Sequence, residues 1–598
     1  MKPYRFFGRC ALVVMFCAGG GYASGAGVDS RTDFKNNDFA NQPGGILLAA
    51  TRDNSTSDNK SGSGYNPALV KAIQENLSKQ GYFLGAIDGV FGPETEGAIR
   101  AYQKSAGLAV DGKPSKSLSD NLQTGGKVGE LLKKLEKAKN RSMDTAKQAL
   151  LSRPETRNLI EGDFDAGILI KHDWNKCVEK TTPRCLLIEA SIAVDEIEKL
   201  EMKNWSLGEI LAAQAKAGLA EDAMNSARRI HDPQLIMVAL RDIAKSQAEA
   251  GRHVEAMEAV DIIPDLNGQI EAYISITEIM ARKGNKQLSY ETSEHLVKYL
   301  DKVKDPLNKA AIMSRLAVIL YNNDEEERSK KYIDNALSIA RRINDDHLRE
   351  KALRHVAAAL AESGDPTRAL KIIKGAKNGA DDVPILMAAA TSHALSGRSD
   401  IALSTADAIE AVRYRSLVLS KIAAYQAGAG MIDDSVETLG KALDAAKTIR
   451  FPFAKAYAMS RIALSYNDVG ISAGDDKDLM AKSLEVADLV SDDRLRAHII
   501  WAIADERKRA ESNFYNFAYK KAISATGDIK SALSKVWMLC DISETRAEKG
   551  DIDGAWDLYD QAKKEAIKIN HPWGRARALA KVALTLSGLA DSATDKGN

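Results

Sequence analysis

The C-terminal two thirds of the chain repeat one pattern of apolar and small residues, beginning near Trp205. Large apolar residues stand eleven positions before each turn, usually Ile, Val or Leu eight before it, and usually Ala seven before it. These offsets fall on one face of a helix, so the pattern predicts helix-turn-helix units with closely packed helices. The turns recur every 33 or 40 residues, at Gly218, Gly251, Gly284, Asp324, Gly364, Gly397, Gly430, Gly470, Ala510, Gly550 and Ala590.

The units are expected to stack, because one unit alone cannot bury its apolar face. The two spacings differ by about two helical turns, which predicts a longer second helix or outgoing loop in the longer units. At roughly 10 Å per layer, the stack would form a curved rod on the order of 100 Å long. We therefore predict an all-α protein with an α-solenoid over residues 205–592, a helical linker or N-terminal cap over 126–204, and a disordered tail over 593–598.

The units resemble tetratricopeptide repeats, in which a small residue on the first helix is followed twelve positions later by one on the second. Pairs with this spacing are Ala244 with Ala256, Ala357 with Ala369, and Ala390 with Ala402. The family's early Trp is replaced by Leu, Tyr, Met or Ile, and its period of about 34 residues is not kept. The resemblance implies a surface for a protein partner, which remains unidentified, and we transfer no peptide-contact residue from the family.

A second pattern lies over residues 65–125, where two amphipathic helices enclose a Gly-rich crossing. Leu69, Ile73 and Leu77 mark one face of the first helix, and a similar apolar face follows in the second. The Asp88-Gly89 pair predicts a turn, since Gly accepts positive φ without steric strain. A second Asp-Gly pair, at residues 111–112, precedes a short third helix expected around residues 117–122.

This stretch resembles the peptidoglycan-binding domain type 1, a small three-helix module that binds the bacterial cell wall. The matching residues are Leu69, Ile73, Gln74, Leu77, Gly81, Tyr82, Gly85, Asp88, Gly89, Phe91, Gly92, Thr95, Ala98, Ile99, Tyr102, Gln103, Gly107, Leu108, Val110, Asp111 and Gly112. Before the last helix the family has Gly and then Thr, where this chain has Ser115 and Ser117; serine still caps a helix well.

The resemblance implies peptidoglycan as a ligand, and five residues of the module are candidates for contact with it. Tyr82 and Phe83 are expected to stack on sugar faces or to belong to the core. Arg100 and Lys104 are expected to meet the carboxylates of wall stem peptides. Asp88 shapes the first turn whether or not it touches the ligand.

The N-terminus has the layout of a secretory signal peptide over residues 1–26, with Lys2, Arg5 and Arg9 before a short apolar run. Cleavage is expected near Ala23 or Ala26, and an uncleaved anchor is the alternative. Residues 27–64 are rich in Ser, Asn, Asp and Gly and predict a disordered linker. No later stretch is apolar enough to span a membrane, so we expect an exported protein of the periplasm or cell envelope.

Charge and cysteine content narrow the classes of function. The chain has 83 basic and 82 acidic residues, which disfavours nucleic acid as a partner. Cys177 and Cys185 are eight residues apart and, in an oxidising compartment, are expected to form a disulfide; two unrelated buried thiols are the alternative. Cys540 is expected to be an inert core thiol.

The sequence contains no recognisable catalytic, cofactor-binding or metal-binding motif. We therefore expect a non-catalytic protein that tethers a tetratricopeptide-like scaffold to peptidoglycan, without cofactor or metal. One alternative is a cell-wall hydrolase or accessory factor with an unrecognised catalytic region in residues 127–204. The other is a pure assembly scaffold with a vestigial wall-binding module.

Overall fold

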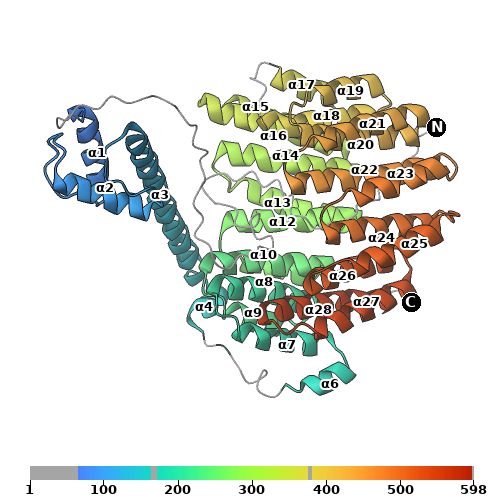
Figure 1. The fold of residues 1–598 in the computed structure, drawn as a ribbon. Coiled ribbons are helices and arrows are strands. Elements are labelled where there is room, and N and C mark those ends of the chain that lie inside the picture. Colours follow the sequence, from blue (N-terminus) through green and yellow to red (C-terminus); the bar gives the residue numbers. More distant parts are fainter. Residues whose placement is uncertain (1–64, 163, 165–171, 375–379, 595–598) are drawn as a thin grey trace. The chain divides into compact units, whose positions relative to one another are not determined.

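The structure is a computed structural model and describes residues 65–162, 164, 172–374 and 380–594. The expected signal peptide, linker and tail therefore lie wholly or mostly outside the described residues. The described helices belong to two compact units, divided near residue 145, and the two are treated separately (Figure 1). No strand occurs in either unit among these residues, in keeping with the expected all-α class.

The first unit is built on three helices, α1 (Pro67–Lys79), α2 (Pro93–Ser105) and α3 (Lys116–Leu151). Pro67 and Pro93 stand at the first positions of their helices, where the missing N–H leaves no bond unmade. The Ser115 hydroxyl oxygen accepts a hydrogen bond from the Leu118 N–H at 3.1 Å and caps α3. A small core joins the three helices, formed by Ile73, Leu77, Phe83, Ala98, Ile99, Tyr102, Leu118 and Leu122.

The third helix is longer than the sequence pattern indicated. We expected a short helix around residues 117–122 and a separate helical linker or cap from residue 126, but α3 is continuous through both. A helical Gly destabilises by about 1 kcal/mol relative to Ala and does not forbid the helix. At Gly125 the absence of a side chain has a packing reason, because a Cβ there would lie 3.1 Å from the Tyr102 hydroxyl.

The second unit consists mainly of helix pairs. Three helices precede the array, α4 (Pro154–Glu161), α6 (Trp174–Glu179) and α7 (Pro183–Asp195). The first helices of the repeats are α8 (Leu200–Lys216), α10 (Pro233–Glu249), α12 (Leu266–Arg282), α14 (Pro306–Asn322), α16 (Asp346–Glu362), α18 (Val383–Leu395), α20 (Val412–Gly428), α22 (Pro452–Ser472), α24 (Asp493–Arg509), α26 (Ala532–Glu548) and α28 (Pro572–Thr594). A short 3-10 turn, Ala380–Asp382, precedes α18.

The second helices of the repeats differ in length, which explains the two repeat periods. They are α9 (Ala220–Ala227), α11 (His253–Ile262), α13 (Lys286–Leu300), α15 (Glu326–Arg341), α17 (Pro366–Ile373), α19 (Ser399–Asp407), α21 (Ile432–Lys447), α23 (Lys477–Asp488), α25 (Tyr515–Gly527) and α27 (Ile552–Ile567). In the 33-residue units these helices have 8 to 10 residues, and in the 40-residue units 12 to 16. The first of the two predicted explanations, a longer second helix, is confirmed.

Small residues hold the two helices of a pair together, as the pattern predicted. Ala244 on α10 and Ala256 on α11 are fully buried, and so are Ala357 on α16 and Ala369 on α17. An alanine side chain occupies little volume between two backbones, so the two helices pack closely and leave few voids. The apolar faces of the repeats join into one continuous core that extends from Leu150 to Leu589.

Three of the eleven predicted turns are misplaced. Gly470 lies inside α22, which runs about one turn further, and the positive φ falls on Gly474. In the next unit the positive φ is at Glu511 rather than Ala510, which shifts the register by one residue and puts Ile503 and Ala504 on the buried face. Ala590 lies within α28, so no second helix follows it among the described residues.

The array closes on itself. Each first helix packs on the next along the series, and the last of them, α28, packs on α8, where the series began (Figure 1). α28 also packs extensively against α7, as the first helix of a complete repeat packs against its second. α7 therefore supplies the second helix of the repeat that α28 begins. The array is thus closed, where a curved rod was expected, and residues 183–195, expected to belong to a helical linker or N-terminal cap, form the second helix of its last repeat.

Ion pairs join residues from opposite ends of the array at this seam. Arg577 on α28 donates two hydrogen bonds to Glu209 on α8, from Nε to Oε2 and from Nη2 to Oε1, both at 2.7 Å. Arg575 donates from Nη2 to Oε1 of Glu189 on α7 at 2.6 Å. The Arg577 guanidinium also lies 4.7 Å from the ring centre of Trp573, a cation–π distance.

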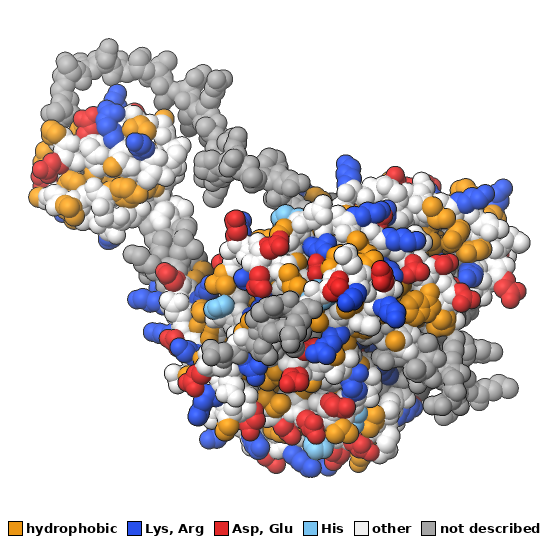
Figure 2. Space-filling model, turned by 90° about the horizontal axis from the view of Figure 1, so that it is seen from below, with side chains coloured by type: hydrophobic (Ala, Val, Ile, Leu, Met, Phe, Trp, Pro, Cys, Tyr) orange, Lys and Arg blue, Asp and Glu red, His pale blue; other side chains and the backbone are white. Residues whose placement is uncertain are grey.

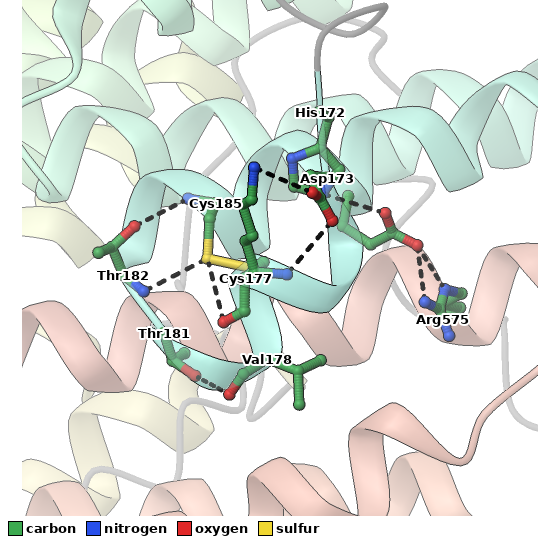
Figure 3. Close-up of a disulfide and its surroundings, with 10 residues drawn as sticks. His172, Asp173, Cys177, Val178, Thr181, Thr182, Cys185 and Arg575 are labelled. Atoms are coloured by element: carbon green, nitrogen blue, oxygen red, sulfur yellow. Dashed lines mark hydrogen bonds and ion pairs between the residues drawn. A yellow bond between two sulfur atoms is a disulfide. The ribbon is translucent and has the colours of Figure 1, made fainter.

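A disulfide joins α6 to α7 next to the seam (Figure 3). It links Cys177 and Cys185, the pair expected from their spacing. The stapled segment also contacts α28, since the Arg575 guanidinium lies 4.8 Å from the ring centre of Trp174. The disulfide thus holds α6 against the helix that closes the array. Cys540 is fully buried, and burial holds the pKa of its thiol well above the ordinary value, at about 12.

Candidate functional site

Buried glutamines brace the two Asp-Gly loops of residues 65–125. The Gln74 Nε2 donates to Asp88 Oδ1, the Val90 carbonyl and Thr95 Oγ1 at 3.0 to 3.1 Å, and its Oε1 accepts from the Gly89 N–H at 2.8 Å. Gly89 has φ +78°, and a Cβ there would lie 2.8 Å from the Pro67 carbonyl oxygen. Only glycine fits this turn without strain.

The second loop repeats the same arrangement. Gln103 Nε2 donates to Asp111 Oδ1 at 2.7 Å, and its Oε1 accepts from the Gly112 N–H at 2.9 Å. Gly112 has φ +72°, and a Cβ there would lie 2.7 Å from Arg100 Nε. Two helix-loop segments of the unit thus use one buried Gln and one Asp-Gly pair each to fix the loop over the helix.

The two loop aspartates are held as carboxylates by these bonds. The Val90 N–H, followed by the Gln74 amide, holds the pKa of Asp88 below its ordinary value. The Lys113 N–H and then the Gln103 amide do the same to the pKa of Asp111. The structure therefore gives Asp88 a bracing function, because its Oδ1 accepts bonds from Val90 and Gln74 within the loop.

The two candidate aromatic residues take different positions. Phe83 is 4 % exposed and lies in the core, so it presents no ring face to a sugar. Tyr82 is half-buried, packs edge-to-face on Tyr102 with ring centres 5.5 Å apart, and its hydroxyl lies 2.6 Å from Ser105 Oγ. Of the two, Tyr82 is the one that retains surface for a ligand.

The two candidate cations lie one turn apart on the outer face of α2. Arg100 is exposed and donates from Nε and Nη2 to Glu96 Oε1 at 3.0 and 2.8 Å. Its Nη1 donates to the Val110 carbonyl at 3.3 Å, which places the guanidinium beside the second loop. Lys104 is exposed. α2 therefore carries both cations, and the hydroxyl of Tyr82 contacts Ser105 at the end of the same helix.

The first loop also carries an apolar surface that was not predicted from the sequence. Leu84 is 97 % exposed, and Ile87 and Val90 are also exposed. The signal in the sequence is apolar residues three apart within a Gly-rich loop. Phe83 and Phe91 already connect this loop to the core, so the other apolar residues are not needed there. An exposed leucine in so small a unit favours a contact surface.

Comparison with known proteins assigns this unit. Residues 66–120 match the model of a family described as a putative peptidoglycan binding domain. This match supports peptidoglycan binding by the first unit. No curated protein matches the chain.

Solved structures of low sequence identity are also similar to the chain. Ton1535 from Thermococcus onnurineus NA1 is 15 % identical, with 56 % of this chain and 97 % of that chain covered and a TM-score of 0.26. A circular tandem repeat protein with a novel repeat topology is 11 % identical, with 89 % and 99 % covered and a TM-score of 0.16. With TM-scores this low, neither likeness bears on function.

Among the residues that the structure describes, no cluster of three or more His, Cys, Asp or Glu side chains is arranged to hold a metal ion. None of the helices found there combines the length and the apolar character that crossing a membrane requires.

Proposed function

We propose that the protein is exported, binds peptidoglycan through residues 66–120, and holds a protein partner on its closed repeat array without catalysing a reaction itself. The observation that carries the proposal is the family match of the first unit. Binding the wall would raise the local concentration of whatever the repeats hold, without any new contact between them.

Tyr82, Arg100, Lys104 and the exposed Leu84 are the contacts we assign to the wall. Arg100 and Lys104 would pair with carboxylates of stem peptides, and the tyrosine and leucine would cover apolar parts of the ligand. Phe83 and Asp88 are left out, the first because it is buried and the second because its carboxylate braces a loop.

Co-sedimentation with purified wall sacculi tests the binding. The chain without residues 1–26 should sediment with sacculi, and a chain that begins at Ala146 should stay in the supernatant. Arg100→Ala should weaken retention roughly five- to ten-fold, since a charge-assisted contact contributes on the order of 1 kcal/mol. Lys71→Ala, an exposed lysine on α1, serves as the matched control. Equal sedimentation of both chains, or of neither, contradicts the proposal.

The non-catalytic part of the proposal needs its own measurement. The same chain should leave sacculi undigested in a zymogram and release no soluble muropeptide on prolonged incubation. Clearing of the substrate would instead favour the hydrolase alternative, with residues 127–204 as the first region to examine by deletion.

A further inference from the structure

The outer face of the array carries a notch where a long second helix is followed by a short one. α15 has 16 residues and α17, the second helix of the next repeat, has 8. At 1.5 Å per residue, α17 is about 12 Å shorter than its neighbour. A cavity of about 360 Å³ lies between them, lined by Leu337, Arg341, Leu353, Arg368, Lys371 and Ile372. We call this cavity the α15–α17 notch.

Its lining combines an apolar floor with a cationic rim. Leu337 is buried, and Leu353 and Ile372 are partly buried against the core. The only charged residues in the lining are the three cations Arg341, Arg368 and Lys371. Lys and Arg lie among Asp and Glu on the face of the repeat unit seen in Figure 2, so a lining with one sign of charge differs from that surface.

Two of these cations are available to a ligand. Arg368 donates to Asp334 at 3.0 Å and lies 3.8 Å from Asp365. Arg341 and Lys371 are exposed, and neither forms an ion pair with another residue in the described part of the chain. An anion placed in the notch would meet both without displacing an existing partner.

The neighbouring groove on the other side of α15 provides a contrast. It has nearly the same volume, about 350 Å³, and lies between α13 and α15, two helices of similar length. Its lining includes both Lys309 and Asp301, which are 3.8 Å apart and neutralise each other. A groove on the outer face is therefore not cationic by position alone. Of these two grooves, only the α15–α17 notch has a lining whose charged residues are all cations.

We infer that the α15–α17 notch binds an acidic amphipathic peptide segment of a partner protein, with carboxylates on Arg341 and Lys371 and an apolar side chain over Leu353. The cationic rim of the notch selects the sign of the segment by charge complementarity, and its apolar floor accepts an apolar side chain of the same segment. This inference rests on the proposed scaffold function and names the class of partner and the place where it docks.

Fluorescence anisotropy with a defined probe tests the docking. The probe is a labelled twelve-residue peptide of alternating Glu and Leu pairs, titrated with the full chain. Arg341→Glu with Lys371→Glu should weaken binding at least about ten-fold, because like charges replace complementary ones. Lys309→Glu, in the neighbouring groove, should leave the affinity unchanged. A peptide with Lys in place of Glu should not bind.

Several outcomes would overturn the inference. They are no binding of the acidic peptide, equal binding of the basic one, or an affinity that the double reversal leaves intact. Binding of the chain to vesicles with anionic headgroups but not to the peptide would also overturn it. Because the reversed residues are exposed, circular dichroism should show an unchanged fold, and sacculus sedimentation of the same variants separates failure of the notch from failure of wall binding.

Discussion

Replacing Arg577 with methionine should open the array at its seam. Arg577 joins α28 to α8 by a two-bonded ion pair with Glu209, and their side chains are only 16 % and 23 % exposed. Methionine keeps much of the apolar volume but leaves the Glu209 carboxylate, which also accepts from Trp205 Nε1 at 2.9 Å, without its cation.

The magnitude follows from the burial of this pair. Removing one partner of a fully buried ion pair destabilises a protein by about 3–5 kcal/mol. Because the Arg577–Glu209 pair is about one fifth exposed, we expect about 2–3 kcal/mol, with solvent relieving part of the unpaired charge. That change corresponds to a roughly 30- to 140-fold larger population of the open seam.

Amide hydrogen exchange measures this population directly. Opening the seam exposes amides of α7 and α28, so their exchange should quicken by the same factor while α14 and α16, far along the array, keep their protection. Arg315→Met is the matched control. Arg315 also pairs with a glutamate on a neighbouring first helix, Glu271, but these side chains are 42 % and 46 % exposed. An exposed pair contributes less than about 1 kcal/mol.

Two results would refute the reasoning. If α7 and α28 keep their protection in the Arg577→Met variant, the ion pair does not hold the seam. If Arg315→Met gives the same loss at the seam, the effect reports charge removal in general. If the ion pair does hold the seam, Glu209→Gln on the Arg577→Met background should recover part of the lost protection, since it removes the unpaired carboxylate.

Two further predictions concern the disulfide and a buried histidine. Replacing Cys177 and Cys185 with serine should destabilise the α6–α7 segment by about 2.5 kcal/mol on the chain-entropy estimate for a separation of 8 residues, measured by thermal unfolding against the oxidised chain. Burial lowers the pKa of His498 to about 4, from 6.5 in an exposed chain, so the folded state favours the neutral imidazole. This stabilisation is present above about pH 6.5 and is lost as pH falls toward 4; His498→Gln should flatten that slope in urea unfolding.

Asp468 should make stability depend on pH in the opposite direction to His498. Burial, reinforced by Glu506, raises the pKa of Asp468 to about 7. The folded state therefore binds this proton more readily than the unfolded chain, and the contribution is lost as pH rises through about 7. Asp468→Asn should remove a slope of the opposite sign to that of His498, and a slope of the same sign would contradict the assignment.

The turns and helix faces of the first unit could be predicted from the sequence because they depend on local chemistry. Asp-Gly pairs predict turns, and the four-residue spacing of Leu69, Ile73 and Leu77 predicts a buried helix face, because both depend on neighbouring residues. The sequence did not predict which aromatic residues lie in the core and which lie on the surface. Tyr82 and Phe83 are adjacent in a loop without periodicity, and only packing against α1 and α2 decides that the phenylalanine is inside.

The repeat unit shows the same division on a larger scale. Sequence by itself determined the helix pairs, their small packing residues and the two repeat periods, since each of these depends on contacts within 33 or 40 residues. Closure depends on a small rotation per repeat, summed over the array, and no local pattern records that sum. The pairing of Arg575 with Glu189, 386 residues apart, and of Arg577 with Glu209, 368 apart, exists only because the summed rotation returns α28 to α7 and α8. Only the tertiary structure shows that α7, expected to be part of a linker or cap, is the second helix of the repeat that α28 begins.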